Sequence, residues 1–328
     1  MRKAGDNRFA LTRVASTFLC AALCCALEGC GSDESIEHSR SAENPGLAPW
    51  TNEDLLDVWG SAPNDVWAVG TNGSALHFDG KAWVSLSSGT TLQLSGVSGS
   101  SSSDVWMVGG ESIAVHWNGA GFENSLGEPD DELLGVWSGG EGHVFATGIS
   151  AGIAFLRHFD GQVWAGRALT QAGSLWDVWG NAATDVWAVG TGRNNKGFLL
   201  RWDGTAWDFE GYDGAPLRSV WGTGPNDVWT VAYDGPIQHW DGVGWRAFDE
   251  NFRLFGVWGS GERDVWAIGA EGALVHYDGS TWAVAPSGTT ENLWGIWGTA
   301  QNDVWIVGGN GTMLHFDGLA WTQSFRSG

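Results

Sequence analysis

Short apolar segments separated by polar turn residues run through most of this chain, from residue 55 to residue 321. Between residues 55 and 86 these segments read "LLDVWG", "DVWAVG", "ALHFDG" and "AWVSL", and apolar positions alternate with small or polar ones. Glycine, asparagine, aspartate and proline separate the segments, and none has the spacing of an amphipathic helix. Alternation with a period of two between turn residues predicts short β-strands joined by tight turns.

The four-segment pattern occurs seven times. Its consensus is L-x-(D/G/S)-V-W-G, a turn, D-V-W-A-V-G, a second turn, and L-x-H-(F/W/Y)-D-G-x-x-W. The copies follow one another at intervals of 37 to 42 residues and begin at Leu55, Leu94, Leu133, Leu175, Leu217, Leu254 and Leu293. Four antiparallel strands in every unit of roughly 40 residues are typical of a propeller blade. We therefore predict an all-β fold, a seven-bladed β-propeller with four antiparallel strands per blade, over residues 50–328.

These Trp-rich repeats resemble those of bacterial β-propeller repeat proteins and, more distantly, those of WD-repeat and kelch-like propellers. The resemblance covers residues 55–321 and implies a closed ring, but propellers carry many unrelated activities. Ring closure leaves two arrangements open. The seventh repeat has a fourth segment of its own from Leu319, whereas "GLAPWT" from Gly46 echoes "GLAWT" from Gly318. We expect Trp50 to pack beside the last blade, near Trp321.

The first 29 residues differ from the repeats. Four basic residues precede an apolar run, Val14–Ala26, that is too short to span a bilayer and is typical of a secretory signal. The following "LEGC", Leu27–Cys30, resembles the lipobox of bacterial lipoproteins, which implies lipidation of Cys30. We expect a signal peptide over 1–29, then the lipidated cysteine and a flexible tether over 30–49. A plain, cleaved signal peptide is the alternative.

This N-terminal pattern predicts an exported protein, anchored by lipid at the bacterial cell envelope and specifically at the outer membrane; a periplasmic or secreted protein is the alternative. All four cysteines lie between residues 20 and 30. The repeats therefore contain no disulfide, cysteine nucleophile or thiolate metal site.

The net charge of the chain limits the classes of partner that we expect it to bind. The chain has a formal net charge of −22, with 16 Lys and Arg against 38 Asp and Glu. Such a surface repels phosphate backbones, so we expect no nucleic-acid partner and membrane contact only through the lipid anchor. We expect a monomeric ring.

Most of the 24 tryptophans fall in columns that recur in every blade. A residue type at one position of each blade is explained most simply by packing between blades, with sugar stacking as the alternative. The same holds for a column of aspartates that opens each second segment, where we expect the carboxylates to accept backbone N–H bonds: Asp65, Asp104, Asp185, Asp227, Asp264 and Asp303. Histidines occur once per blade and cannot gather three ligands, so we expect no metal and no cofactor.

Residues that break the repeat are the candidates for function. The position after each first leucine varies most, and it reads Leu56, Ser95, Leu134, Trp176, Arg218, Phe255 and Trp294. If the first segment is the innermost strand, this column lies at the mouth of the central channel, where Trp176, Arg218, Phe255 and Trp294 would suit ligand binding. Asp57 and Asp177 follow in the next column. A lengthened loop in the fourth repeat adds a local polar and basic spot: Arg193, Asn194, Asn195 and Lys196.

These features favour a non-catalytic binding or scaffold module that holds a protein or glycan ligand on one propeller face. The alternative is a propeller-type carbohydrate-active enzyme, a glycosidase or lyase. A sialidase-like site would need three converging arginines and a tyrosine nucleophile, and the first two repeats contain no arginine. We find no nucleotide-binding loop, serine-nucleophile elbow or calcium loop in the sequence.

Overall fold

The structure, a computed structural model, describes residues 53–126, 131–140, 142–210, 214–248 and 252–324. The chain divides into two compact units, Met1–Asn44 and Pro45–Gly328, and every described residue belongs to the second. The predicted signal peptide, Cys30, the tether and Trp50 lie outside the described residues.

Each repeat forms one four-stranded blade, and we number the blades in chain order. Blade one consists of β1 (Leu55–Ala62), β2 (Asp65–Gly70), β3 (Ser74–Phe78) and β4 (Trp83–Ser87). Blade two consists of β5 (Leu94–Ser101), β6 (Asp104–Gly109), β7 (Ile113–Trp117) and β8 (Phe122–Leu126). Blade three consists of β9 (Asp131–Ser138), β10 (Val144–Ser150), β11 (Ile153–Phe159) and β12 (Trp164–Leu169). Blade four consists of β13 (Ala172–Ala182), β14 (Asp185–Gly192), β15 (Gly197–Trp202) and β16 (Trp207–Phe209).

The remaining blades follow the same order. Blade five consists of β17 (Leu217–Gly224), β18 (Asp227–Ala232), β19 (Ile237–Trp240) and β20 (Trp245–Phe248). Blade six consists of β21 (Leu254–Gly261), β22 (Asp264–Gly269), β23 (Leu274–Tyr277) and β24 (Trp282–Val284). Blade seven consists of β25 (Leu293–Ala300), β26 (Asp303–Gly308), β27 (Met313–Phe316) and β28 (Trp321–Gln323). Short 3₁₀ turns join the second and third strands of four blades: η1 (Thr71–Gly73), η2 (Gly110–Ser112), η3 (Ala270–Gly272) and η4 (Gly309–Gly311).

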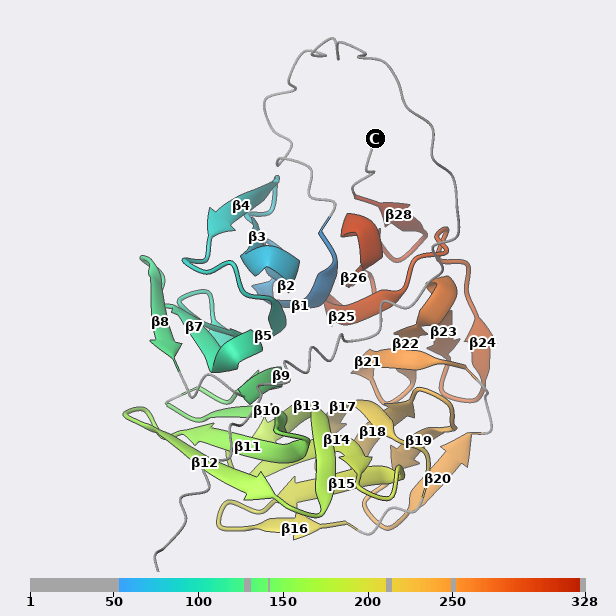
Figure 1. Cartoon of the computed structure of the whole chain (residues 1–328). Helices are drawn as coiled ribbons and strands as arrows, with labels where there is room; N and C mark the ends of the chain where they lie inside the picture. The colour runs from blue at the N-terminus through green and yellow to red at the C-terminus, as the bar shows by residue number, and fades with distance from the viewer. Residues whose placement is uncertain (1–52, 127–130, 141, 211–213, 249–251, 325–328) are drawn as a thin grey trace, which may run out of the picture. The chain divides into compact units, whose positions relative to one another are not determined.

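The predicted seven-bladed β-propeller is confirmed. Strands pair antiparallel in sequence order within each blade, so no strand is exchanged between blades. The first strands are the innermost: each contacts the first strands of both neighbouring blades, and β1 lies beside β25 to close the ring (Figure 1). Blade seven takes all four of its strands from residues 293–323, which is the closed-blade arrangement that the sequence left open.

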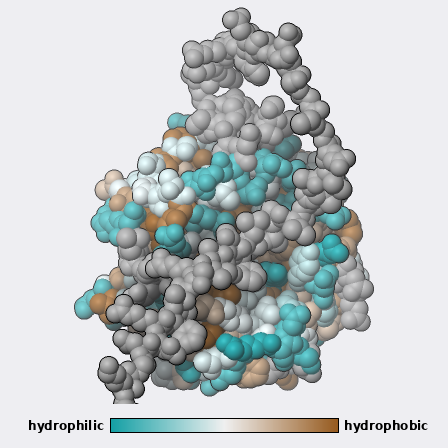
Figure 2. All heavy atoms as spheres, in the orientation of Figure 1, coloured by the Kyte–Doolittle hydropathy of each residue, from teal (hydrophilic) through white to brown (hydrophobic). Residues whose placement is uncertain are grey.

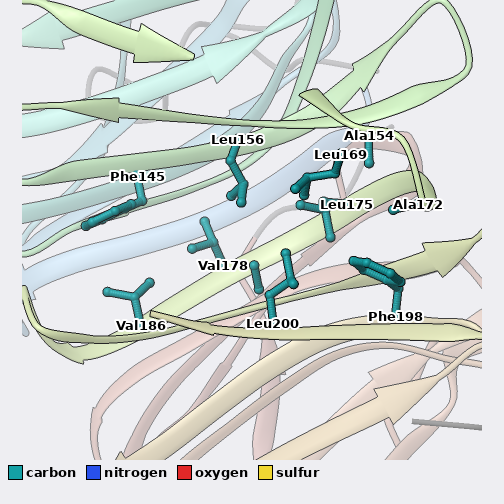
Figure 3. Packing of buried hydrophobic residues seen from close by; sticks show 11 residues of the cluster. Phe145, Ala154, Leu156, Leu169, Ala172, Leu175, Val178, Val186, Phe198 and Leu200 are labelled. Carbon is teal, nitrogen blue, oxygen red and sulfur yellow. The ribbon is translucent and has the colours of Figure 1, made fainter. Parts of the chain in front are cut away.

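The hydrophobic core is divided among the interfaces between blades. The described residues form seven apolar clusters, and each contains side chains from two adjacent blades. Figure 3 shows the cluster in which Phe145 and Leu156 of blade three face Leu175 and Val186 of blade four. The cluster between blades seven and one is built in the same way, so the closing interface has an apolar core of its own.

Tryptophans of the first and second strands pack between blades, as predicted. The Trp59 ring of blade one lies against Gly99 of blade two, where an added Cβ would come within 2.6 Å of the indole. The same contact joins Trp179 to Gly222. A first strand that reads "VWG" is therefore half of two interfaces: its tryptophan covers the next blade, and its glycine receives the tryptophan of the previous one.

The aspartates that open the second strands have other hydrogen-bond partners than we predicted. We predicted bonds from backbone amides, but Asp65 accepts hydrogen bonds from two side chains, Nε2 of His77 at 2.6 Å and Oγ of Ser61 at 2.5 Å. The carboxylate thus links the end of the first strand to the third strand, and His77 stacks on Trp67. The aspartates of the later "DG" turns, by contrast, bind backbone amides, as Asp79 does with Lys81 and Ala82. His77 is therefore hydrogen-bonded within its own sheet.

Candidate functional site

The variable column of the sequence corresponds to a bulge in the innermost strand. In blade one, Leu55 pairs with Gly70 and Asp57 with Val69, so Leu56 has no partner across the ladder. The same register shift leaves out Ser95, Leu134, Trp176, Arg218, Phe255 and Trp294 in the other blades. A bulged residue is free of ladder pairing, and bulges commonly direct side chains into functional sites. Sequence variation is therefore tolerated here in a way that it is not at the neighbouring paired positions.

Four bulge residues come together on the face where the first strands begin, which we call the upper face. The Arg218 guanidinium lies 3.9 Å from the centroid of the Trp176 ring, across the interface of blades four and five. At the other end, Phe255 and Trp294 stack at 4.4 Å across the interface of blades six and seven.

Tyr233 joins these two pairs into one surface. Its ring lies 5.7 Å from the Arg218 guanidinium and stacks with Phe255, also at 5.7 Å. We call the five residues the aromatic–guanidinium arc: Trp176, Arg218, Tyr233, Phe255 and Trp294. All five side chains are half-buried, so each presents part of its surface to solvent.

Two features flank the arc. The exposed Arg253 lies 5.8 Å from the Tyr233 ring and 3.6 Å from Asp234. At the other end, the Trp176 indole N–H donates to Thr191 Oγ1 at 3.2 Å. Thr191 leads into the predicted polar loop of Arg193 to Lys196, which follows β14 on the same face. The loop is a turn held by Gly192 N–H and Lys196 carbonyl at 2.7 Å, with Asn195 at a φ of 61°.

Asp57 and Asp177, which directly follow bulge residues in their first strands, have surroundings that differ from those of the arc. Asp57 accepts bonds from the amides of Val58 in its own blade and Val97 in blade two, each at 2.8 Å. Asp177 likewise joins blades four and five through Ser219 Oγ and the amide of Val220. Burial raises the pKa of Asp57 to about 7, against these amide bonds and with a further increase from the charge of Asp177.

A carboxyl group with a pKa near neutrality could act in proton transfer. Both oxygens of Asp57 are nevertheless bonded to backbone amides, and the bond from Val97 holds two adjacent blades together. We therefore assign Asp57 and Asp177 to the closure of the channel wall, next to the arc.

The opposite, lower face carries the repeating networks. There the Asp104 carboxylate accepts from His116 at 2.8 Å, a bond that lowers the pKa of Asp104. A hollow of about 300 Å³ opens between blades six and seven, and its two ionisable groups, Asp264 and His276, are bonded to each other at 2.5 Å. This hollow is thus lined by the same structural pair that recurs in other blades.

Sequence reasoning missed Tyr233 and Arg253. Both stand where the repeat is least regular: "VAYDG" in blade five replaces the "VGTNG" of blade one, and Arg253 directly precedes the first leucine of blade six. Both positions adjoin the variable column, which could have pointed to them. They were missed because the irregular segments that contain them do not align with the other repeats.

Within the described parts of the chain, no group of three or more His, Cys, Asp or Glu residues could hold a metal ion. No described helix is long and apolar enough to cross a membrane. Figure 2 shows one side of the molecule, where the described surface is largely hydrophilic with small apolar patches.

No protein-family model and no curated protein sequence matches this chain. Solved structures do. YCF48 from Cyanidioschyzon merolae has a TM-score of 0.63 and 19% identity, covering 81% of this chain and 96% of its own. A structure of YCF48 bound to D1 peptide has a TM-score of 0.64 and 18% identity, with coverages of 81% and 94%.

Two further propellers show how varied this architecture is. The WD40 propeller domain of Doa1 has a TM-score of 0.63 at 12% identity, covering 83% of this chain and 94% of that domain. Streptogramin B lyase has a TM-score of 0.68 at 14% identity, with the same coverages. At these identities the likeness concerns the fold alone. One of these propellers binds a peptide and another is a lyase, so the fold does not assign a function.

Proposed function

We propose that this protein is a non-catalytic binding module that holds a segment of a partner protein on its upper face. The observation that carries the proposal is the aromatic–guanidinium arc. Four of its five side chains come from bulges of four successive blades, and the fifth, Tyr233, bridges them. Trp, Tyr and Arg are the residue types that are enriched among those contributing most of the binding free energy at protein interfaces.

The position of the arc supports this proposal. A regular repeat needs only small or aliphatic residues in this column, as Leu56, Ser95 and Leu134 show in blades one to three. The arc departs from that pattern in one continuous sector. The structure of YCF48 with D1 peptide shows that a propeller of this size can hold a peptide.

The test uses the residues that the chain itself places in this column. The arc variant carries Trp176→Leu, Phe255→Leu and Trp294→Leu, and the control carries Val243→Ser and Leu319→Ser, two residues that are each 90% exposed beyond the "DG" turns of the lower face. Peptides are selected against the wild-type protein from a displayed random library, and a glycan array is run in parallel.

We expect selected peptides to bind the wild type and the control equally, and the arc variant at least tenfold more weakly. Peptides that bind all three proteins equally would contradict the proposal. Glycans that bind only when the arc is intact would assign the same face to a sugar ligand instead.

We further propose that the propeller is displayed at the bacterial cell envelope through lipidated Cys30. The support is the N-terminal pattern of basic residues, short apolar run and "LEGC". Labelling of cells with a radioactive fatty acid tests it: the wild-type chain should incorporate label and partition into detergent, and Cys30→Ser should do neither. Equal labelling of the two proteins would exclude lipidation at this cysteine.

A further inference from the structure

The described chain enters the propeller on the face that carries the arc. Glu53 and Asp54 directly precede β1, and hydrogen bonds from the turn after β2 hold them on this face. Thr71 donates its amide to the Asp54 carbonyl at 3.0 Å and its hydroxyl to Glu53 Oε2 at 2.8 Å. The Asn72 side chain donates to the same Glu53 oxygen at 2.5 Å. The fold therefore fixes the point at which the chain joins the ring.

This entry point lies beside the blade-seven end of the arc. β1 contacts β25, β26 and η4 of blade seven (Figure 1). Asp54 Oδ1 accepts the amide of Asn310 at 2.8 Å. The neighbouring Gly309 donates its amide to the Asn292 carbonyl at 2.9 Å, and Asn292 lies two residues before Trp294. The entry point and the last residue of the arc are thus held by adjacent segments of one face.

The distance from this face to the proposed anchor is limited by the length of the chain between them. Residues 30–52 connect Cys30 to Glu53. A segment of 23 residues spans at most roughly 80 Å, even when it is fully extended. With Cys30 lipidated, the entry point cannot lie further than this from the membrane. The arc beside it shares that limit, whereas the "DG" turns lie on the opposite face of the ring.

The charge of the upper face argues against the lipid surface itself as the ligand of the arc. Exposed carboxylates stand in equivalent turns of this face, Glu111 in η2 and Glu271 in η3. The exposed Arg253 that flanks the arc lies 3.6 Å from the carboxylate of Asp234. With a net charge of −22, the protein is repelled by anionic headgroups within about 8 Å at physiological ionic strength. A ligand of the arc must therefore extend from the membrane.

We propose that the arc binds a segment of a partner protein that is anchored in the same membrane as Cys30. This inference rests on the proposed function of the arc and on the proposed lipidation. Two molecules held at one membrane meet at an effective concentration that their linkers set, about millimolar for short flexible ones. The half-buried arc can therefore hold such a partner with a modest intrinsic affinity.

The test compares two anchor positions on the same propeller. The chain from Cys30 to Gly328 contains the whole second compact unit and has Cys30 as its single cysteine. It is coupled through Cys30 to a lipid in uncharged phosphatidylcholine vesicles. The control carries Cys30→Ser and Val243→Cys, which moves the lipid to a residue of the lower face that is 90% exposed. Its lipid is attached through a spacer of the same contour length as residues 30–52.

The probe is a library-selected peptide that requires the arc, used either free in solution or coupled by a short linker to a lipid of the same vesicles. Fluorescence energy transfer measures its binding. We expect both anchored proteins to bind the free peptide equally. The protein anchored at Cys30 should bind the vesicle-held peptide at least threefold more strongly than the control does.

The possible failures are distinguishable. Equal binding of the vesicle-held peptide by the two proteins, with equal binding of the free peptide, would overturn this inference and leave the binding function standing. A free peptide that binds neither protein would overturn both. Absence of fatty-acid labelling at Cys30 in cells would remove the anchor and with it the inference. Flotation of the uncoupled chain with phosphatidylserine vesicles, lost in the arc variant, would assign the arc to the lipid surface instead.

Discussion

At the scale of single residues, departures from the repeat occur in compensating pairs. Blade two has Ser98 where other first strands have tryptophan, and blade three has Ser138 where the next glycine would receive that ring. The amide of Ser138 donates to Ser98 Oγ at 3.1 Å, so a hydrogen bond replaces the tryptophan–glycine contact. The repeat alignment contains each exception at a different position of the first strand, and the structure shows that they face each other across one interface.

The serine pair gives a direct test of this contact. Ser98→Trp alone should destabilise the protein by about 1–3 kcal/mol, because the indole meets the Ser138 side chain in a packed interface. Adding Ser138→Gly should recover at least about 1 kcal/mol, as contacting residues couple by roughly 0.5–3 kcal/mol. Urea unfolding of the four proteins of this double-mutant cycle measures the coupling. Strict additivity would show that the two positions do not face each other.

Asp57 predicts a pH effect on stability. Its pKa rises from the ordinary 3.8 to about 7 in the folded protein, so between these values the folded state binds a proton that the unfolded chain does not. Its contribution is therefore fully present below about pH 4 and is lost as the pH rises through about 7, a loss of the order of a few kcal/mol.

Asp57→Asn keeps the shape of the side chain and removes this titration. Unfolding free energies of wild type and variant, measured from pH 5 to 8, should show the wild type losing stability relative to the variant as the pH rises. Parallel curves would mean that Asp57 titrates near its ordinary pKa.

At the scale of elements, the number, order and type of the strands could be predicted because each strand lies between turn residues and repeats seven times. The bulge in each first strand could not. Leu254 and Val257 are apolar core residues whether or not Phe255 is paired across the ladder. The hydrophobic pattern of the sequence therefore does not indicate that Phe255 is the extra residue of a bulge. The aspartate network was missed for a related reason: Asp65 and His77 are 12 residues apart and meet only because β2 and β3 pair in one register.

The bulge predicts unequal tolerance at adjacent positions. Phe255→Leu substitutes the residue that blades one and three use and should cost less than about 1.5 kcal/mol, since a half-buried side chain at a position outside the strand ladder is exchanged for another apolar one. Leu254→Ala, at a fully buried position, should cost about 2–5 kcal/mol. Urea unfolding compares the two variants. A larger loss for Phe255→Leu would assign the arc to the core and not to a binding surface.

At the scale of the whole molecule, the closing interface is built like every other. Between blades six and seven, the amide of Glu271 donates to Asn292 Oδ1 at 3.0 Å. Across the closure, the amide of Asn310 donates to Asp54 Oδ1 at 2.8 Å, in the same place of the repeat. Trp83 of blade one and Trp305 of blade seven pack edge to face with centroids 5.3 Å apart. Among the described residues, the ring closes by repeating its standard contacts.

This equivalence predicts that the two polar links contribute equally. Asp54→Ala and Asn292→Ala should each lower the unfolding free energy by about 0.5–1.5 kcal/mol, the usual net value of a hydrogen bond. Thermal and urea unfolding of both variants should agree within error and remain a single transition. A much larger loss for Asp54→Ala would show that closure depends on that link more than the repeated geometry implies.

The same ring presents two chemically different faces. The lower face carries the repeated aspartate–histidine pairs, in which the two side chains are hydrogen-bonded to each other within one blade. The upper face carries the residues that do not repeat, from Trp176 to Trp294. We infer that ligand binding resides in this second set, because the regular positions already take part in packing between blades.

Hydrogen–deuterium exchange on the complex with a library-selected peptide tests this inference by locating the bound surface. We expect slower exchange on binding in the segments that carry the arc, and no change in the "DG" turns of the lower face. The arc segments are residues 175–178, 217–220, 231–235, 254–257 and 293–296. Protection confined to the lower face or to the outer fourth strands, with the arc segments unchanged, would contradict it.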